Sequence, residues 1–441
     1  MRSYRHAFAA VAAALLILSA AAQDAVAGQQ SAPIASASAQ SASTFAQSAP
    51  ADKPADKPVT AGWQDGFFIQ SANGDFRLQI GLLVHADARF ALDDTNETVT
   101  DSFLVRRARP SLRGRIGRRF EFYLNPDFAG GTLVVHDAYL DTIFSPAFRI
   151  RAGKGKTPFG MERLHSATNL LFFERALPNA LVPNRDVGVQ VLGDISGGLV
   201  SYLGGVMNGV ADGGSGDLDA SDSKDVSGRL IVRPFTKIAT SPLKGLGLAV
   251  SGSRGKQTGA AALPTLRTQS IQQQFFAYSG AAADGVRTRF SPQVFYFYKA
   301  FGGWFEQVHT KTAIRKGAVA EDIEHDAWQL TGSYVLTGEA ATDAGAGVRP
   351  RNNFDFGNGH WGAFQVAARY HALKVDDLAF TRDFVAPGSS RKVEAWTVGL
   401  NWYLTPNFRY IFNFERSVFD DNTATARKPE NGLVFRTQVN F

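Results

Sequence analysis

The chain has 441 residues, a formal net charge of +6, 34 phenylalanines, 43 glycines and no cysteine. The lack of cysteine excludes disulfides, thiolate metal sites and thiol nucleophiles, and we expect neither a metal nor a cofactor. Beyond the N-terminal segment, no apolar run is long enough for a membrane-spanning helix. The mature protein is therefore either soluble or a membrane protein built from strands.

Two N-terminal segments are expected to lie outside the folded domain. Residues 1–27 have the features of a secretory signal peptide, because Arg2 and Arg5 precede an apolar stretch and Ala-Val-Ala at 25–27 offers a cleavage site. Residues 28–62 are mainly Ala, Ser, Gln and Pro and cannot bury a core, which predicts a flexible spacer. The folded domain is then expected to cover residues 63–441.

From Trp63 onward, segments with alternating apolar and polar residues are separated by clusters of Gly, Pro, Asn and Asp. This pattern is typical of transmembrane barrels. An even number of strands places both chain termini on one side of the membrane, and about 16 strands leave an aqueous lumen. The predicted fold class is all-β, a transmembrane antiparallel β-barrel of about 16 strands. The expected strands are 75–92, 101–117, 119–130, 133–144, 148–156, 186–194, 199–209, 225–235, 246–255, 287–300, 303–314, 326–337, 361–375, 391–404, 408–418 and 433–441.

The last three segments show the alternation most clearly. Aromatic and aliphatic residues occupy one parity, and Thr, Asn, Gln, Arg and Glu occupy the other. A soluble β-sandwich also alternates, but its polar face meets bulk water and tends to carry mixed solvating charge. The composition here favours the membrane barrel, with Trp304, Trp361 and Trp402 in the interfacial girdles.

Loop lengths predict that short turns lie at one end of the barrel and long loops at the other. The short connections are 117–118, 300–302 and 405–407, and the long ones are 157–185, 256–286, 338–360 and 376–390.

The stretch FLVRRARPSLRGRIGRRF, residues 103–120, contains seven arginines. At a period of two, one face carries four arginines and the other carries four apolar residues. These are Arg107, Arg109, Arg113 and Arg115, and Leu104, Ala108, Leu112 and Ile116. A guanidinium facing hydrocarbon costs about 2–4 kcal/mol near the midplane, so the arginine face is expected to line the lumen.

Two residues of this strand do not fit a regular pattern. Pro110 cannot donate to a strand pairing, which predicts a bulge. Arg106 lies on the lipid parity, where a bulge or a position near the headgroups accommodates it.

Positive charge is concentrated in this part of the chain, since residues 101–175 contain 13 Lys and Arg against 7 Asp and Glu. Arg151 shares a strand parity with Arg149, and Lys154 and Lys156 follow. A lumen lined with such groups concentrates anions and rejects cations, and the arginine fork matches oxyanions. Basic residues of later loops, such as Arg267, either extend this lining or contact lipopolysaccharide phosphates.

Several strings resemble the phosphate-selective porin O and P family of the Gram-negative outer membrane. They are RRARPSLRG, NPDFAGG, DAYLD, KTPFGMERL, YVLTGE, RYHALKVDD and VGLNWYL, in that order from about residue 63 to the C-terminus. The resemblance implies a homotrimer of 16-stranded barrels, each with its own anion-conducting pore. It also implies that the third loop folds inward and forms a constriction.

Carried over by position, the family's basic residues correspond to Arg106, Arg107 and Lys154, and the constriction loop corresponds to 157–185. Arg163 stands where the phosphate-binding members have lysine, a departure that is expected to keep the anion preference while changing affinity or substrate. Arg267 resembles an arginine of an inward-reaching later loop. The predicted anion-binding or pore-lining residues are Arg106, Arg107, Arg109, Arg113, Arg151, Lys154, Lys156, Arg163 and Arg267.

The predicted function is passive uptake of phosphate or pyrophosphate-like oxyanions through an outer-membrane porin that contacts lipid and lipopolysaccharide and binds no nucleic acid. A porin for sugar acids or other small organic anions is an alternative, with Tyr123 and Tyr403 as stacking groups. A barrel enzyme such as a phospholipase is another alternative, but the pairs at 136–137, 165–166 and 325–326 are adjacent residues, which point to opposite faces of a strand. A further alternative is an adhesive or structural barrel whose lumen is plugged.

Overall fold

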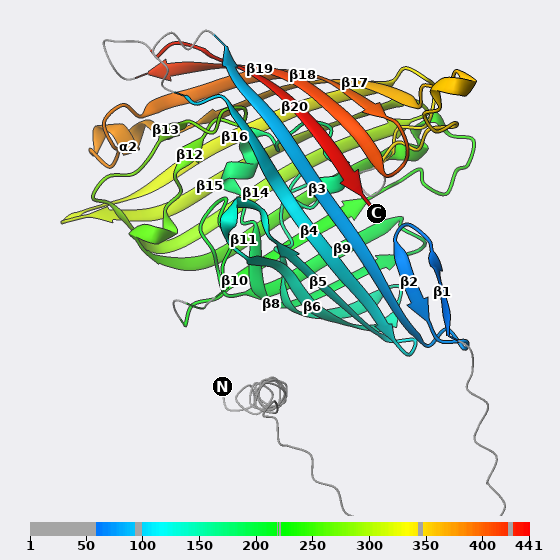
Figure 1. Ribbon diagram of the computed structural model, residues 1–441. Helices are drawn as coiled ribbons and strands as arrows, with labels where there is room; N and C mark the ends of the chain where they lie inside the picture. Colours follow the sequence, from blue (N-terminus) through cyan, green and yellow to red (C-terminus); the bar gives the residue numbers. More distant parts are fainter. Residues whose placement is uncertain (1–58, 93–98, 218, 220–221, 343–346, 422–426) are drawn as a thin grey trace, which may run out of the picture. The chain divides into compact units, whose positions relative to one another are not determined.

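The computed structural model describes residues 59–92, 99–217, 219, 222–342, 347–421 and 427–441 (Figure 1). The expected signal peptide and nearly all of the expected spacer lie outside these residues. Among the residues described, no helix is long and apolar enough to cross a membrane.

The described chain forms a closed antiparallel barrel of sixteen strands, in which each strand pairs with the next and β20 pairs with β3. The predicted fold class is confirmed. The barrel strands are β3 (Phe76–Leu92), β4 (Ser102–Ile116), β5 (Phe120–Asp127), β6 (Val134–Ser145), β7 (Phe148–Lys156), β8 (Arg185–Ile195), β9 (Val200–Met207), β10 (Asp225–Val232), β11 (Leu246–Gly259), β14 (Ala282–Tyr298), β15 (Phe301–Lys316), β16 (Val319–Val335), β17 (Ala363–Lys374), β18 (Ser390–Tyr403), β19 (Phe408–Asp421) and β20 (Glu430–Asn440).

All sixteen expected segments coincide with barrel strands, and β16 shows the largest difference because it begins seven residues earlier than expected. The hairpin of β15 and β16 extends where the outer parity turns polar. There, Lys311 lies 3.3 Å from Asp322 and 3.1 Å from Glu324 on the neighbouring strand. An apolar parity is therefore a poor guide to where such a strand ends.

A short hairpin precedes the barrel, formed by β1 (Thr60–Trp63) and β2 (Phe67–Gln70). It begins three residues before the expected start of the folded domain. β2 pairs with Arg77–Ile80 of β3, next to the segment of β3 that pairs with β20. The rings of Trp63 and Phe67 lie 5.1 and 6.0 Å from that of the C-terminal Phe441. The hairpin thus extends the sheet at the seam between the first and last barrel strands.

The two ends of the barrel differ (Figure 1). The end that carries β1, β2 and the turns β4–β5, β6–β7 and β8–β9 is called the turn end, and the opposite end, with β12, β13 and α2, is called the loop end. The expected alternation of loop lengths is wrong at one place. The described residues 336–342 and 347–362 belong to the connection from β16 to β17 at the turn end, where Arg349 is 2.8 Å from Asp65. By contrast, β15 and β16 are joined at the loop end by only two residues.

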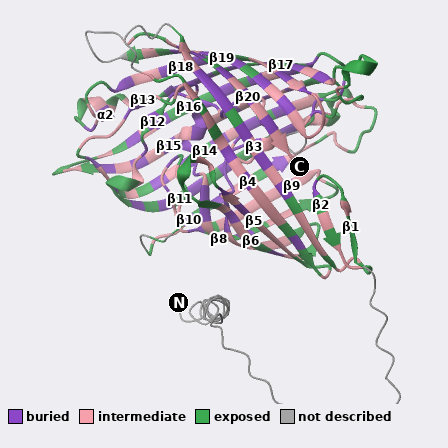
Figure 2. Ribbon diagram, viewed as in Figure 1, coloured by how far each residue is buried: buried purple, intermediate pink, exposed green. Residues whose placement is uncertain are grey.

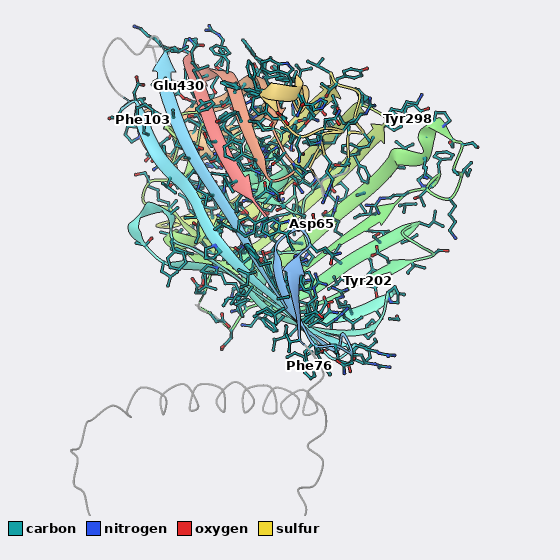
Figure 3. The ribbon with its side chains drawn as sticks, turned by 45° about the vertical axis from the view of Figure 1, so that its right-hand side comes forward. Asp65, Phe76, Phe103, Tyr202, Tyr298 and Glu430 are labelled. Carbon is teal, nitrogen blue, oxygen red and sulfur yellow. The ribbon has the colours of Figure 1, made fainter. Side chains whose placement is uncertain are left out.

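Side chains alternate between the two faces of the wall, and buried and exposed positions follow one another along the strands (Figure 2). Phe103 is 84% exposed near the loop end of β4, and Phe76 is exposed at the turn end of β3 (Figure 3). In β18 to β20 the predicted inner parity is buried and polar, as at Asn401, Glu415 and Arg436. The predicted inner and outer parities of these strands are confirmed.

Trp304 does not lie in an interfacial girdle. It is only 6% exposed, and its ring lies 5.4 Å from that of His165, which places it on the inner face. Trp361 and Trp402 are on the outside at the turn end, 6.4 Å apart.

Three loops fill one half of the lumen. Loop 157–184, between β7 and β8, is called the constriction loop, and the others are 260–281 and 375–389. Their apolar side chains, such as Phe159 and Phe276, pack against the inner face of β15 to β18, where Val308 and Ile323 are buried. The loops carry η2 (Ala167–Asn169), η3 (Leu177–Leu181), η5 (Ala260–Ala262), β12 (Leu266–Arg267), β13 (Gln274–Phe276) and α2 (Asp377–Thr381), and η1 (Ala129–Gly131), η4 (Pro242–Gly245) and η6 (Phe356–Asn358) lie in other connections.

Candidate functional site

Two cavities lie along the other half of the barrel, mainly against β3 to β9. The turn-end cavity has a volume of about 580 Å³, and its lining includes Asp65, Gln79 and Phe441. The loop-end cavity has a volume of about 750 Å³ and extends to the loops after β9 and β11. Arg109 and Arg185 line both cavities. These two arginines therefore mark the place where the two cavities meet.

The constriction loop is held against the wall by buried carboxylates. Glu306 of β15 accepts hydrogen bonds from the backbone N–H groups of Met161 (2.6 Å) and Glu162 (3.2 Å). Glu162 in turn accepts from the N–H of Ala176 at 2.8 Å. Gly160 has a φ of +75°, which L side chains rarely adopt. The KTPFGMERL block thus shapes and anchors the loop.

A bulge in β4 brings two adjacent arginines to the inner face. His85 of β3 is opposite Arg107, whereas Ala86 is opposite Val105, so Arg106 is the extra residue. Arg106 and Arg107 both line the loop-end cavity. A bulge leaves one residue unpaired and re-aims the side chains beyond it, which explains how Arg106 avoids the lipid face.

The bulge also corrects two expectations about this strand. Leu104 is opposite Asp87, whose side chain is fully buried, so it faces inward and not outward. Pro110 is not in a bulge, because it pairs in register with Leu82. The pairing of β4 with β5 begins only at Leu112, so a proline at position 110 interrupts no pairing on that side.

Glu174 of the constriction loop forms the centre of the ion pairs at the bulge. Its Oε1 accepts from Nε of Arg106 at 2.6 Å, and its Oε2 accepts from Nη2 of Arg107 at 3.1 Å. Burial by itself would raise the pKa of the Glu174 carboxyl, but the surrounding guanidiniums, Arg107 and Arg106 foremost, lower that pKa well below its ordinary value. The carboxylate is therefore ionised at neutral pH.

The two arginines between the cavities are also paired. Nε of Arg109 donates to Asp127 at 2.7 Å, and Arg185 donates to both oxygens of Asp137 at 3.0 and 3.2 Å. Their side chains are held in place by these carboxylates, so that the junction has a fixed basic lining.

Three basic side chains at the constriction loop have backbone carbonyls as their hydrogen-bond partners among the described residues. Lys156 donates to the carbonyls of residues 164 and 165 at 3.0 and 2.7 Å, Arg163 donates to the carbonyl of residue 179, and Arg175 donates to the carbonyls of residues 162 and 165 at 2.9 and 2.8 Å. Within the described part of the chain, none of the three has a carboxylate oxygen within 4 Å. Burial, reinforced by neighbouring guanidiniums, lowers the pKa of Arg163 to about 9 and that of Arg175 to about 10, still above neutrality.

Three further expected residues have different surroundings. Arg113 lies 5.2 Å from the ring of Tyr123, in the turn-end cavity. Arg151 lines the same cavity and donates to both oxygens of Asp141 at 2.8 and 2.9 Å. Arg267 lines the loop-end cavity.

Lys154 lies apart from both cavities. Its ammonium pairs with Asp217 in the loop after β9. The structure thus brings together Arg106, Arg107, Arg109, Arg163 and Arg267 at the loop end and Arg109, Arg113, Arg151 and Lys156 at the turn end.

Sequence reasoning missed Arg175, Arg185 and Arg229. Arg175 lies within the constriction loop, Arg185 follows that loop as the first residue of β8, and Arg229 lies in β10. For Arg175 and Arg185, the position in or next to that loop was the available signal. With them, the described residues that line the two cavities include eleven basic side chains against five carboxylates. These are Arg106, Arg107, Arg109, Arg113, Arg151, Lys156, Arg163, Arg175, Arg185, Arg229 and Arg267, and Asp65, Asp127, Asp137, Glu174 and Asp212.

Among the described residues, the adjacent pairs at 136–137 and 325–326 do not form dyads, although His136 lies 3.3 Å from Asp127 across the strands. Asp137 binds Arg185 and not the adjacent His136, which lies 2.9 Å from Arg109. His325 lies 2.7 Å from the hydroxyl of Tyr278. These contacts fix side chains on the inner wall.

A closed transmembrane barrel with charged cavities and a loop folded into its lumen is the architecture of a porin. The chain belongs to the phosphate-selective porin O and P family, whose model matches residues 78–441. Membership confirms the resemblance seen in the sequence. It places the chain among channels of the Gram-negative outer membrane and indicates a channel rather than an enzyme.

Solved structures support the fold. The outer membrane channel DcaP of Acinetobacter baumannii is 12% identical with a TM-score of 0.54, covering 85% of this chain and 99% of that one. An anion-selective porin from Comamonas acidovorans is 12% identical with a TM-score of 0.51, covering 83% and 100%. The trimer form of OmpT from Vibrio cholerae is 10% identical with a TM-score of 0.50, covering 83% and 99%. At such identities the likeness shows the fold alone. Comparison with curated proteins finds no match.

Proposed function

We propose that this porin is a passive, anion-preferring channel whose cargo is phosphate or a similar oxyanion such as pyrophosphate. The observation that carries the proposal is the set of Lys156, Arg163 and Arg175, three basic side chains beside the cavities whose partners within the described part of the chain are backbone carbonyls. Their charge is not cancelled by a neighbouring carboxylate. In a lumen with low-dielectric walls, such uncancelled charge attracts anions and repels cations.

The placement of the arginines supports a series of weak sites. An anion that enters from the loop end meets Arg267 and Arg163, then Arg109 and Arg185 where the cavities meet, and then Arg113 in the turn-end cavity. Guanidiniums bind tetrahedral oxyanions through two parallel N–H groups. Several moderate sites favour conduction, because a single tight site would hold the ion.

A second cargo class, small organic anions or sugar acids, is supported by two tyrosine side chains in the lining of the turn-end cavity. The rings of Tyr123 and Tyr139 lie 5.5 Å apart, and the guanidinium of Arg151 is 3.8 Å from the centre of the Tyr139 ring. Phenol faces beside guanidiniums suit a planar or hydroxylated carboxylate. Comparing current block by phosphate, pyrophosphate and gluconate separates the two cargo classes.

We also propose that the protein assembles as a homotrimer and contacts lipid and lipopolysaccharide through its outer face. The trimer form of OmpT, which has the same fold, supports the first part. Exposed apolar residues such as Phe103, Leu140 and Leu330 on the outer face support the second.

Reversal potentials in planar bilayers test the proposed selectivity. The wild-type protein in a KCl gradient should show a chloride-over-potassium preference, and Arg107→Gln combined with Arg163→Gln should reduce it. The matched control is Arg315→Gln with Arg382→Gln, which removes the same charge from exposed loop-end positions that line neither cavity. A cation-selective or non-selective wild type would refute the proposal, as would equal effects of the two double variants.

A further inference from the structure

One acidic residue occupies the place where the loop-end arginines would otherwise meet a permeating anion. Glu174 belongs to the constriction loop, whereas its partners Arg106 and Arg107 belong to the barrel wall. All three side chains line the loop-end cavity. The pair of arginines therefore faces the lumen but is bound to a carboxylate carried by the loop.

The contacts of this carboxylate are those of a bound oxyanion. Oε1 accepts from Arg106 at 2.6 Å and from Arg89 at 3.3 Å, and Oε2 accepts from Arg107 at 3.1 Å. Two oxygens that receive three guanidinium N–H groups reproduce the pattern by which arginines bind phosphate and carboxylate ligands.

The neighbouring acid, Asp87, has a different position. It comes from β3 and accepts from Arg436 at 2.6 and 2.7 Å and from Arg89 at 2.8 Å. Its side chain is fully buried and does not line the cavity. Asp87 therefore pairs with Arg89 and Arg436, which do not line the cavity. Glu174 is the acid that pairs with the two cavity-lining arginines, 106 and 107.

We propose that Arg106 and Arg107 form an oxyanion site whose resident occupant is the Glu174 carboxylate, so that Glu174 is a tethered competitor of the permeating anion. The inference rests on the proposed anion channel and adds a specificity-determining residue to it. A permeating phosphate takes up the guanidinium contacts while the carboxylate withdraws, and the carboxylate returns as the phosphate leaves. Competition of this kind keeps phosphate binding weak enough for release, as conduction requires.

The test measures block of chloride current by inorganic phosphate in Glu174→Gln. The variant keeps the shape of the side chain but removes its charge, so phosphate should block at about three- to tenfold lower concentration, the range expected when a partly solvated ion pair no longer competes. Asp212→Asn is the matched control, because Asp212 lines the same cavity but pairs with Arg289, which does not line it. In Asp212→Asn the blocking concentration should stay within about twofold of wild type, or about 0.4 kcal/mol, because the ion-pair partners of Asp212 among the described residues are Arg287 and Arg289 and not Arg106 or Arg107.

The outcomes separate this inference from the proposed function. If wild-type channels show no anion preference, the proposed function fails and the inference fails with it. If wild type prefers anions but Glu174→Gln and Asp212→Asn change phosphate block equally, only general cavity charge matters and the inference alone is overturned. If Glu174→Gln does not fold, Arg106→Gln is the second variant, because it removes a guanidinium of the proposed oxyanion site and not the competing carboxylate. It should weaken phosphate block by a similar factor, and unchanged block would overturn the inference.

Discussion

The anchor between Glu306 and the constriction loop gives the sharpest prediction about the loop itself. In Glu306→Leu the replacement has a similar bulk but no acceptor. The N–H groups of Met161 and Glu162 would then lose their partner at a site where Glu306 is only 1% exposed. Gln329, the third donor to this carboxylate, keeps its contact with Glu162 at 3.1 Å.

The size of the effect follows from the two donors. A buried donor without an acceptor costs about 1–3 kcal/mol, so the docked loop should lose about 2–6 kcal/mol relative to the undocked loop. Because each 1.4 kcal/mol is a factor of ten, the undocked population should rise at least about thirtyfold. The barrel strands themselves should keep their pairing.

Hydrogen exchange of the constriction loop is the direct assay, with single-channel recording as a second readout. Glu306→Leu should speed exchange in residues 159–182 and add larger, noisier conductance levels. Glu324→Gln is the control, because Glu324 is exposed and its ion-pair partners among the described residues, His309 and Lys311, lie on the neighbouring strand of the same hairpin. Unchanged loop exchange in Glu306→Leu would show that this carboxylate does not hold the loop.

Two further predictions concern the same loop. In Gly160→Ala, a Cβ forced to a φ of +75° would sit 3.2 Å from Oε1 of Glu306. Loop docking should therefore weaken by about 1–2 kcal/mol, measured as faster proteolysis of the loop, whereas equal proteolysis rates would count against the strain. Glu174 predicts the pH response. Its pKa is lowered in the folded protein, so its stabilising contribution is present above the ordinary value of 4.5 and is lost as the pH falls below it. Proteolytic protection of the loop should be constant from pH 7 to 5 and decline at lower pH, and a decline already complete by pH 5.5 would assign the effect to another group.

The barrel could be predicted from the sequence because lipid imposes a strict parity on its strands. In β18 to β20 that parity alone predicts Asn401, Glu415 and Arg436 as inner residues, and all three are buried. The bulge at Arg106 was harder to place, since Pro110 carried the stronger local signal. Periodicity records which face a residue takes, but not where one residue is inserted.

The partners of the arginines and the packed half of the lumen were not predictable in the same way. The pairing of Glu174 with Arg106 depends on the path of the constriction loop, which no strand pattern encodes. Val308 and Ile323 lie on the inner parity, where a polar lumen was expected. They are apolar because loops and not water cover them.

Apolar loop side chains fill the half of the lumen next to β15 to β18, whereas the other half contains the two cavities. Strands β15 to β18 are sandwiched between apolar material on both faces, from lipid outside and from loop side chains inside. Strands β4 to β8 have an apolar environment on one face only. The proposed conducting path therefore lies off the barrel axis, and the backbone amides around the ring are shielded unequally. A detergent that replaces lipid around the outer face does not displace the buried apolar cluster between the loops and β15 to β18. The off-axis path should therefore persist after extraction from the bilayer.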